Sequence, residues 1–284
     1  MPELPEVEVL VRHLRPLLQG KTIHAVHVRR AKVLAPVSAR RFAQTLRGAK
    51  FTGLSRRGKY LLFRLRTARP ARSLVLVGHL GMTGRMYLLP ARTNLPRHAA
   101  VVLSLGQDKF VFEDTRYFGR LTFDASAVEK LGPEPLGAEF RAGDFARALR
   151  RSRQAIKVRL LDQTLVAGVG NIYASEALFR AGIAPVLPAR SLTATQVQQL
   201  WRAIRAVLRE AIRCGSTVPL NYAGTRLRDR LFYFGRAPGT PDFYEERLRV
   251  YDRAGQPCIR CGTSIRRRVQ AARSTYYCPH CQRR

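Results

Sequence analysis

The spacing of apolar residues near the N-terminus predicts an amphipathic helix. Residues 5–18 place apolar side chains three and four positions apart, at Val7, Leu10, Val11, Leu14, Leu17 and Leu18. The pattern then changes to short β-rich runs, bounded by Gly, Pro or charge, at residues 23–28, 60–63, 73–77, 100–103 and 109–112. Strands at this spacing predict an antiparallel β-sandwich, against which the first helix would pack.

The second half of the chain has a helical pattern. We expect helices at residues 143–151, 154–165, 171–181 and 193–214, after a Gly- and Pro-rich linker at 126–142. The last helix opens with Thr193 and Gln196 in capping-box spacing, with Leu192 and Val197 placed as a hydrophobic staple. The expected fold class is α+β, with domains at 1–125, 143–249 and 250–284.

The charge balance indicates a polyanionic partner. The chain has 51 Lys+Arg against 19 Asp+Glu, a formal net charge of +32. Nucleic acid is the usual polyanion for such a protein. A membrane surface is disfavoured, because the basic residues are spread along the chain and no run approaches 18 apolar residues. The N-terminus lacks the pattern of a signal peptide, so we expect a soluble cytosolic protein.

Four cysteines near the C-terminus predict a metal site. Cys258 and Cys261 form one C-x2-C pair, and Cys278 and Cys281 form the second, with 16 residues between the pairs. Two such pairs are typical of a closed structural zinc site with no open coordination position. Arginines at 266–268 and 273 would form a basic hairpin between them. Cys214, outside this set, is expected to be a small packed residue.

The first residues offer a candidate nucleophile. A start methionine followed by proline is normally removed, and the α-amino group of Pro2 would then be partly neutral and nucleophilic near pH 8. Glu3 and Glu6 are carboxylates within reach of it. The alternative is structural, since acids and proline both suit the first turn of a helix.

Further candidate segments lie in loops. Residues 56–59 (RRGK), 79–84 (HLGMTG) and 114–119 (DTRYFG) each also have a structural explanation: a solvated basic loop, a turn with a core methionine, and an Arg116–Asp114 pair. Residues 166–171 (VAGVGN) precede a helix whose N-terminal N–H groups would suit phosphate. There, Asn171 is alternatively the helix N-cap.

Taken together, these motifs resemble the bacterial formamidopyrimidine-DNA glycosylases, bifunctional base-excision repair enzymes of the wider family that includes endonuclease VIII. The resemblance runs from residue 1 to about 283. It is carried by residues 2–8 (PELPEVE), 57–61 (RGKYL), 79–82 (HLGM), 168–174 (GVGNIYA) and 273–278 (RSTYYC). It implies an N-terminal β-sandwich with its helix, a helix-two-turn-helix module, a finger with one structural Zn²⁺, and damaged double-stranded DNA as the partner. We expect a monomer in the cytoplasm, associated with the nucleoid.

The resemblance also implies roles. Pro2 would form a Schiff base with the deoxyribose, Glu3 would protonate the ring oxygen, and Lys59 and Arg273 would assist the β- and δ-eliminations. Glu6, Ser216 and Thr217 would support the pocket. Met82, Arg116 and Phe118 would fill the gap left by the flipped nucleotide. The residues implied as further DNA contacts are His79, His98, Arg151, Arg153 and Asn171.

Two departures from the family pattern affect the predicted substrate. Thr115 and Tyr117 replace the proline and second arginine of the usual Asp-Pro-Arg-Arg-Phe-Gly, so we expect a working wedge on a more flexible loop. The segment after Thr217, which folds over an oxidised purine in the family, is longer and more aromatic here. The resemblance implies formamidopyrimidines and 8-oxoguanine as substrates, and the altered segment leaves a preference for oxidised pyrimidines or abasic sites as the alternative. A non-catalytic zinc-ribbon protein that binds nucleic acid is the alternative from another class.

Overall fold

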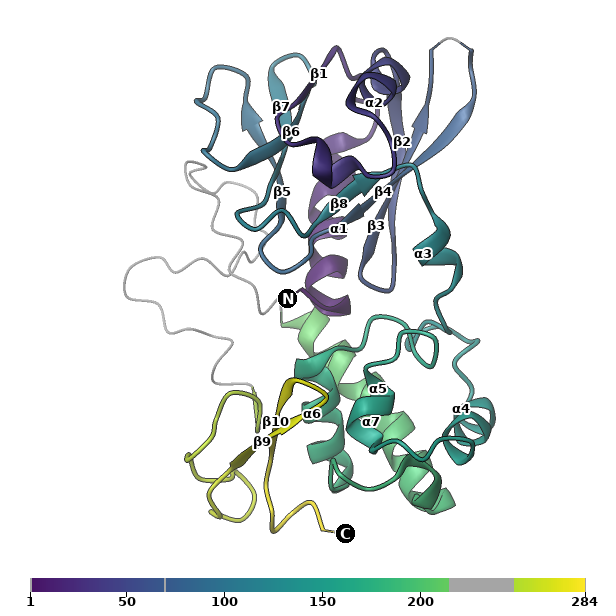
Figure 1. The fold of residues 1–284 in the computed structure, drawn as a ribbon, viewed down its shortest axis with the longest axis vertical. Helices are drawn as coiled ribbons and strands as arrows, with labels where there is room; N and C mark the ends of the chain where they lie inside the picture. Colours follow the sequence, from purple (N-terminus) through teal and green to yellow (C-terminus); the bar gives the residue numbers. More distant parts are fainter. Residues whose placement is uncertain (1, 69, 215–247, 284) are drawn as a thin grey trace. The chain divides into compact units, whose positions relative to one another are not determined.

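The computed structural model describes residues 2–68, 70–214 and 248–283 (Figure 1). Within them the chain packs as two compact units: residues 6–129 with Pro2, and residues 3–5, 130–214 and 248–283. The elements are α1 Leu4–Leu18, β1 Ala25–Val28, η1 Ala31–Leu34, α2 Ala39–Leu46, β2 Lys50–Arg57, β3 Tyr60–Arg66, β4 Ser73–His79, β5 Arg85–Pro90, β6 Ala99–Ser104, β7 Asp108–Glu113, β8 Arg120–Thr122, α3 Ser126–Glu129, α4 Ala142–Arg150, α5 Ile156–Leu160, α6 Asn171–Ala181, η2 Ala189–Ser191, α7 Ala194–Arg213, β9 Arg266–Gln270 and β10 Arg273–Tyr277.

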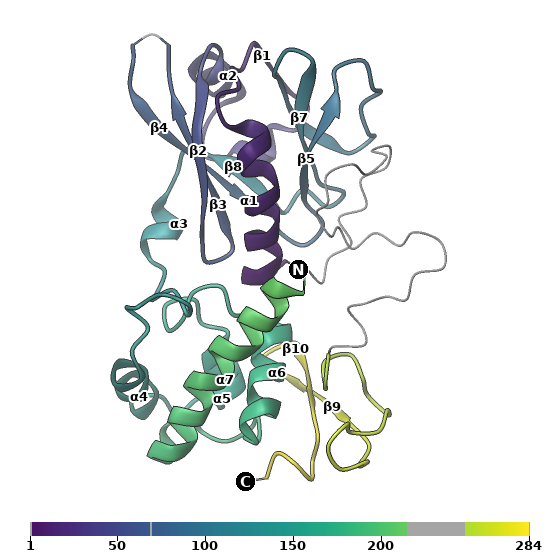
Figure 2. The same ribbon diagram turned by 180° about the vertical axis from the view of Figure 1, so that it is seen from behind.

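The first unit consists of two four-stranded antiparallel sheets and the helix that leads into them. The strand orders are β1-β6-β7-β5 and β2-β3-β4-β8. Helix α1 lies alongside the sheets (Figure 2). Its predicted apolar face is buried in the core that both sheets share, except Leu17, which is 38% exposed. The predicted α+β class with a leading helix and antiparallel sheets is confirmed.

Strand β2 shows why part of this unit escaped sequence analysis. In its partner β3 every second residue is buried, namely Leu61, Phe63 and Leu65. The strand extends three residues past the predicted run. In β2 the register shifts between Phe51 and Gly53, which breaks the two-residue period. The buried side chains of β2 are therefore too irregularly spaced to predict a strand.

The second unit is mainly helical. The capping box of α7 is confirmed: the Thr193 hydroxyl accepts from the Gln196 N–H, and the Gln196 side chain accepts from the Thr193 N–H. The helix predicted at 154–165 is wrong beyond Leu160. There the Asp162 carboxylate accepts hydrogen bonds from the backbone and hydroxyl of Thr164, which favours a turn over continued helix.

The predicted basic hairpin is present in this unit as β9 and β10, paired antiparallel. Arg266, Arg267 and Arg268 on β9 are all exposed. Behind the hairpin, a small core joins Phe179 of α6 to Ile265 and Tyr276 and to two of the cysteines. The hairpin therefore presents a basic outer surface while its base packs on α6.

The segment predicted as a linker is partly structured. Residues 126–129 form α3, and Phe140 is buried in the core of the second unit, with its carbonyl accepting from the Trp201 indole N–H at 2.9 Å. The domain boundaries drawn from the sequence stay predictions. Across the described residues, no helix has both the length and the apolar character needed to span a membrane.

Candidate functional site

Glu3 lies at the N-terminus of α6, within the second unit. Its buried carboxylate accepts backbone hydrogen bonds from Gly170 at 2.7 Å, Ile172 at 2.8 Å and Tyr173 at 3.3 Å. These N–H groups have no partner within the helix, so the carboxylate occupies an anion-binding position and is stabilised there as an anion. The residue directly after the candidate nucleophile is thereby held rigidly. Pro2 itself is buried.

A glycine makes this approach possible. Leu4 donates its backbone N–H to the Gly168 carbonyl at 3.1 Å. Gly168 has φ +84°, and a Cβ at this position would come within 2.6 Å of the Leu4 Cβ. The glycines of the GVGN motif thus hold the N-terminal segment against α6.

Asn171 connects α6 to the basic hairpin. Its amide donates to the Ser274 carbonyl at 2.9 Å, and its Oδ1 accepts from the Lys157 Nζ at 2.5 Å. The structural alternative for this residue is wrong, because the N-cap is Gly170 and Asn171 is the first helical residue. Its side chain is therefore used for contacts between elements.

Lys157, Tyr251 and Arg273 complete this cluster, and of these three the sequence predicts only Arg273. Burial, together with the Arg273 charge, lowers the pKa of Lys157 to about 8, against the opposing effect of Glu3. Burial also raises the pKa of Tyr251, whose side chain is hydrogen-bonded to Asn171. Lys157 and Tyr251 could not be identified from sequence, because only the fold brings them to Asn171.

The Lys157 environment predicts a pH dependence of stability. In the unfolded chain its pKa returns towards 10.5, so between about pH 8 and 10.5 the unfolded state binds more protons, and stability rises with pH. We expect wild type to gain stability relative to Lys157→Met between pH 7.5 and 10, measured by denaturant unfolding. Because methionine keeps the aliphatic stem, the comparison isolates the charge. The prediction would be contradicted if the free energies of unfolding of wild type and Lys157→Met differed by the same amount at pH 7.5 and at pH 10.

In the first unit, Lys59 and His79 lie at the same end of the β3–β4 pair, where Tyr60 is paired with His79. Lys59 is buried, in the turn between β2 and β3, and His79 ends β4. Burial, followed by the charges of Lys59 and Arg120, lowers the pKa of His79 to about 4, so its ring is neutral at pH 7. The His79 Nδ1 accepts from the Gly81 N–H at 3.2 Å. The ring proton is therefore on Nε2, which can donate to an anion.

The structure brings the three predicted wedge residues together. Arg116 donates to the Met82 sulfur at 3.3 Å, and its guanidinium lies 4.7 Å from the centre of the Phe118 ring. Met82 is 42% and Phe118 48% exposed, so both apolar side chains are accessible to a ligand. The alternative of an Arg116–Asp114 ion pair is wrong, because Asp114 accepts the backbone N–H of Arg116 at 3.1 Å and not its guanidinium.

The remaining predicted residues have varied surroundings. In the first unit Glu6 is buried in the first turn of α1, and His98 lies beside Tyr117, with 3.5 Å from Nδ1 to the hydroxyl. In the second unit Arg151 and Arg153 are exposed after α4. Ser216, Thr217 and the expected lesion-covering segment lie outside the described residues.

The four predicted cysteines converge on one point. Their sulfur atoms all lie within 4.8 Å of one another, with separations of 3.8 Å for Cys258–Cys281, 3.5 Å for Cys261–Cys278 and 3.4 Å for Cys261–Cys281. Zinc–sulfur bonds of about 2.3 Å in a tetrahedron imply sulfur separations of about 3.8 Å. The geometry therefore fits a four-thiolate metal site.

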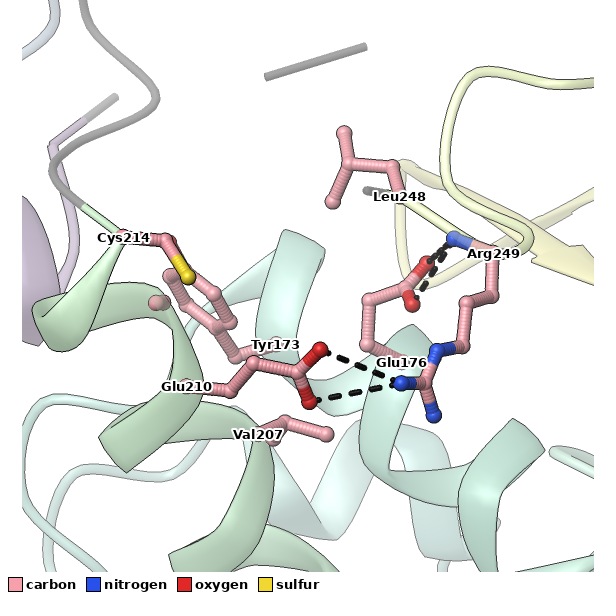
Figure 3. A pocket seen from close by; sticks show the side chains of 8 residues that line it. Tyr173, Glu176, Val207, Glu210, Cys214, Leu248 and Arg249 are labelled. Atoms are coloured by element: carbon pink, nitrogen blue, oxygen red, sulfur yellow. Dashed lines mark hydrogen bonds and ion pairs between the residues drawn. The ribbon is translucent and has the colours of Figure 1, made fainter. Parts of the chain in front are cut away.

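A pocket between α6, α7 and residues 248–249 is shown in Figure 3. Glu176 accepts backbone hydrogen bonds from Arg249, Val250 and Tyr251, and Glu210 pairs with the Arg249 guanidinium at 3.1 Å. Burial raises the pKa of Glu176, although the hydrogen bonds from these backbone donors act to lower it. The carboxylates lining the pocket thus hold the start of the finger segment on α6 and α7.

Three family models match the chain. They are the formamidopyrimidine-DNA glycosylase N-terminal domain at residues 1–121, the H2TH domain of the same enzymes at 131–220, and a zinc finger found in FPG and IleRS at 255–284. The predicted helix-two-turn-helix module and C-terminal four-cysteine finger are thereby confirmed.

Similar proteins match over nearly the full length. A formamidopyrimidine-DNA glycosylase of Desulfitobacterium hafniense is 41% identical over 99% of this chain and 100% of its own, and one of Edwardsiella ictaluri is 43% identical over the whole of both. The crystal structure of the Thermus thermophilus protein superposes with a TM-score of 0.81 at 40% identity, covering 99% and 98% of the two chains. The crystal structure of the Lactococcus lactis enzyme, solved bound to DNA containing an AP site, gives a TM-score of 0.84 at 29% identity. The match covers 99% of this chain and 100% of the Lactococcus lactis chain.

Proposed function

The chain belongs to the formamidopyrimidine-DNA glycosylase family, and from that premise we propose that it excises oxidised bases from double-stranded DNA and then cuts the strand. The observation that carries the proposal is the cluster at the start of α6. There the N-terminal segment is fixed beside Asn171, Lys157 and Arg273, groups suited to binding phosphate. The damaged nucleotide must first be flipped out of the stack to reach such a site.

In the proposed reaction the Pro2 nitrogen, free once Met1 is removed, attacks C1′ of the damaged nucleotide. The bond to the base breaks, and the base leaves with its electron pair and takes up a proton from water. The Glu3 carboxylate accepts the proton that the attacking Pro2 nitrogen loses and passes it to O4′ as the C1′–O4′ bond opens, so that a cationic imine remains. As a carboxylate, Glu3 stabilises this cation.

Strand cutting follows from the imine, which acidifies the proton on C2′. Loss of that proton expels the 3′ phosphate, and loss of the C4′ proton expels the 5′ phosphate, so that β- and then δ-elimination occur. Lys59 and Arg273 are proposed to assist these steps, and water then releases Pro2 by hydrolysis. Met82, Arg116 and Phe118 would occupy the vacated stack.

We propose zinc as the metal of the four-cysteine site and a structural role for it, because four thiolates leave no coordination position for a substrate. Elemental analysis of the purified protein tests its identity. The expected monomer in the cytoplasm, at the nucleoid, belongs to the same proposal. The preferred lesion would be identified by comparing excision and strand nicking on duplexes that contain 8-oxoguanine, a formamidopyrimidine, an oxidised pyrimidine or an abasic site. Tight binding without a cut product on any duplex would favour the non-catalytic alternative.

DNA affinity should fall steeply with salt, since each neutralised phosphate releases counterions. Arg266→Gln should lower the slope of log affinity against log salt by about 0.9, the contribution of one phosphate contact. Fluorescence anisotropy at several salt concentrations measures it. Arg202→Gln, which removes the same charge from the exposed face of α7, is the matched control. Equal slopes for wild type and Arg266→Gln would contradict a phosphate contact at Arg266.

A further inference from the structure

Asp114 lies between the two loops that carry the wedge residues. One loop is the turn after β4, residues 80–84, which holds Met82, and the other is residues 114–119, which holds Arg116 and Phe118. The Asp114 side chain is fully buried, although Met82 and Phe118 on these loops are exposed. A buried carboxylate is retained only where several donors surround it, so its contacts reveal what it holds in place.

The carboxylate binds both loops at once. Its Oδ1 accepts from the Thr83 hydroxyl at 2.5 Å and from the Arg116 N–H at 3.1 Å, and its Oδ2 accepts from the Gly119 N–H at 2.8 Å. Thr83 follows Met82, and Gly119 follows Phe118. The hydrogen bonds therefore attach next to each wedge residue, and the bond from Thr83 crosses from one loop to the other.

Two glycines keep the loops in direct contact. Gly81 has φ +62°, and a Cβ there would lie 2.6 Å from the Gly119 nitrogen and 2.8 Å from the Phe118 carbonyl carbon. A Cβ at Gly119 would lie 2.8 Å from the His79 carbonyl oxygen. The backbones thus meet without intervening side chains, and relative movement of the loops would break the Asp114 hydrogen bonds.

We propose that Asp114 is a positioning residue for base flipping: its carboxylate clips the two loops together, so that Met82 and Phe118 enter the duplex as one preassembled wedge. This inference rests on the proposed function and adds a residue to it. In the loop of residues 114–119, Thr115 stands where the family has proline. The hydrogen bonds to Asp114 restrain this loop and so supply the rigidity that a proline would otherwise give. Arg116, carried on the same loop, is set against both apolar side chains.

The test compares two substrates of the same protein. Excision of a paired lesion requires the wedge to hold the vacated stack open, whereas cutting at a preformed abasic site has no base to extrude. In Asp114→Asn the amide can still accept at Oδ1, but its NH₂ group then faces the Gly119 N–H and the negative charge is lost. We expect excision of the paired lesion to slow about tenfold more than abasic-site cutting, the effect of losing one hydrogen bond to a charged group.

Thr83 provides matched variants in case Asp114→Asn does not fold. Thr83→Val removes the hydroxyl that crosses between the loops and should lower the ratio of paired-lesion to abasic-site rates several-fold. Thr83→Ser keeps the hydroxyl and should retain the wild-type ratio. A purely structural role would instead lower both rates and the melting temperature together, without changing the ratio.

The possible outcomes separate this inference from the proposed function. A lowered ratio in Asp114→Asn and Thr83→Val, restored in Thr83→Ser, supports the clip. An active wild type whose ratio is unchanged in both variants overturns it. A wild-type protein that is inactive on both substrates would overturn the proposed function, and with it the positioning role proposed for Asp114.

Discussion

A chain that keeps one extra residue in front of Pro2 should cut abasic-site DNA at least about a thousandfold more slowly than the chain that begins at Pro2. The extra residue turns the Pro2 amine into an amide, whose nitrogen lone pair is delocalised and no longer nucleophilic. All side chains remain in place, so the comparison isolates the amine. A tag whose protease leaves one glycine before Pro2 provides the blocked protein.

Single-turnover nicking measures the rates, and DNA affinity serves as the control. We expect the blocked and free chains to bind abasic-site DNA within a few-fold of each other, because the phosphate contacts do not involve the amine. Equal nicking rates would contradict a role for Pro2. A loss of binding in parallel with nicking would mean that the extra residue displaces the N-terminal segment from α6.

Cys258→Ser should unfold the finger and weaken DNA binding by at least about tenfold at physiological salt. Zinc binding contributes about 10–16 kcal/mol to the folding of isolated zinc-finger peptides at pH 7, and the small core behind β9 and β10 offers little to replace it. Without the metal the hairpin arginines would lose their common surface. The helical core around α7 does not contain the cysteines, so most of the helical circular dichroism should remain.

Zinc content and affinity are measured together on wild type, Cys258→Ser and Cys214→Ser. Cys214 is half-buried at the end of α7 and does not belong to the four-sulfur cluster, so its replacement controls for removing any thiol. We expect the zinc content and the DNA affinity of Cys214→Ser to equal those of the wild type. One zinc per chain and full affinity in Cys258→Ser would contradict the four-thiolate site.

Features set by local sequence could be predicted. The four-cysteine cluster follows from residue spacing alone, and the Thr193 capping box involves side chains three residues apart. Helix α1 was predictable because its apolar positions recur every three or four residues. In each case the physical cause lies within a few residues, or within a known ligand geometry.

Contacts between distant segments could not be predicted. The motifs suggested Glu3 and Asn171 separately, but nothing in either segment indicated that the Glu3 carboxylate accepts the backbone N–H groups of Gly170 and Ile172. Lys157 lies within a predicted helix, and nothing in that pattern indicates a contact with Asn171. The spacing of Asp114 and Arg116 is that of an ordinary ion pair. Such roles depend on which backbones the fold brings together.

Borohydride trapping followed by peptide mapping tests most directly whether Pro2 carries the reaction. Lys157 is the rival amine, because its lowered pKa of about 8 leaves part of it neutral at physiological pH. Borohydride reduces the imine to a stable bond between the attacking nitrogen and the sugar. We predict that tryptic peptide 2–12 of the trapped protein carries the deoxyribose on its N-terminal nitrogen. The sugar on the peptide that contains Lys157 or Lys59 would contradict the assignment.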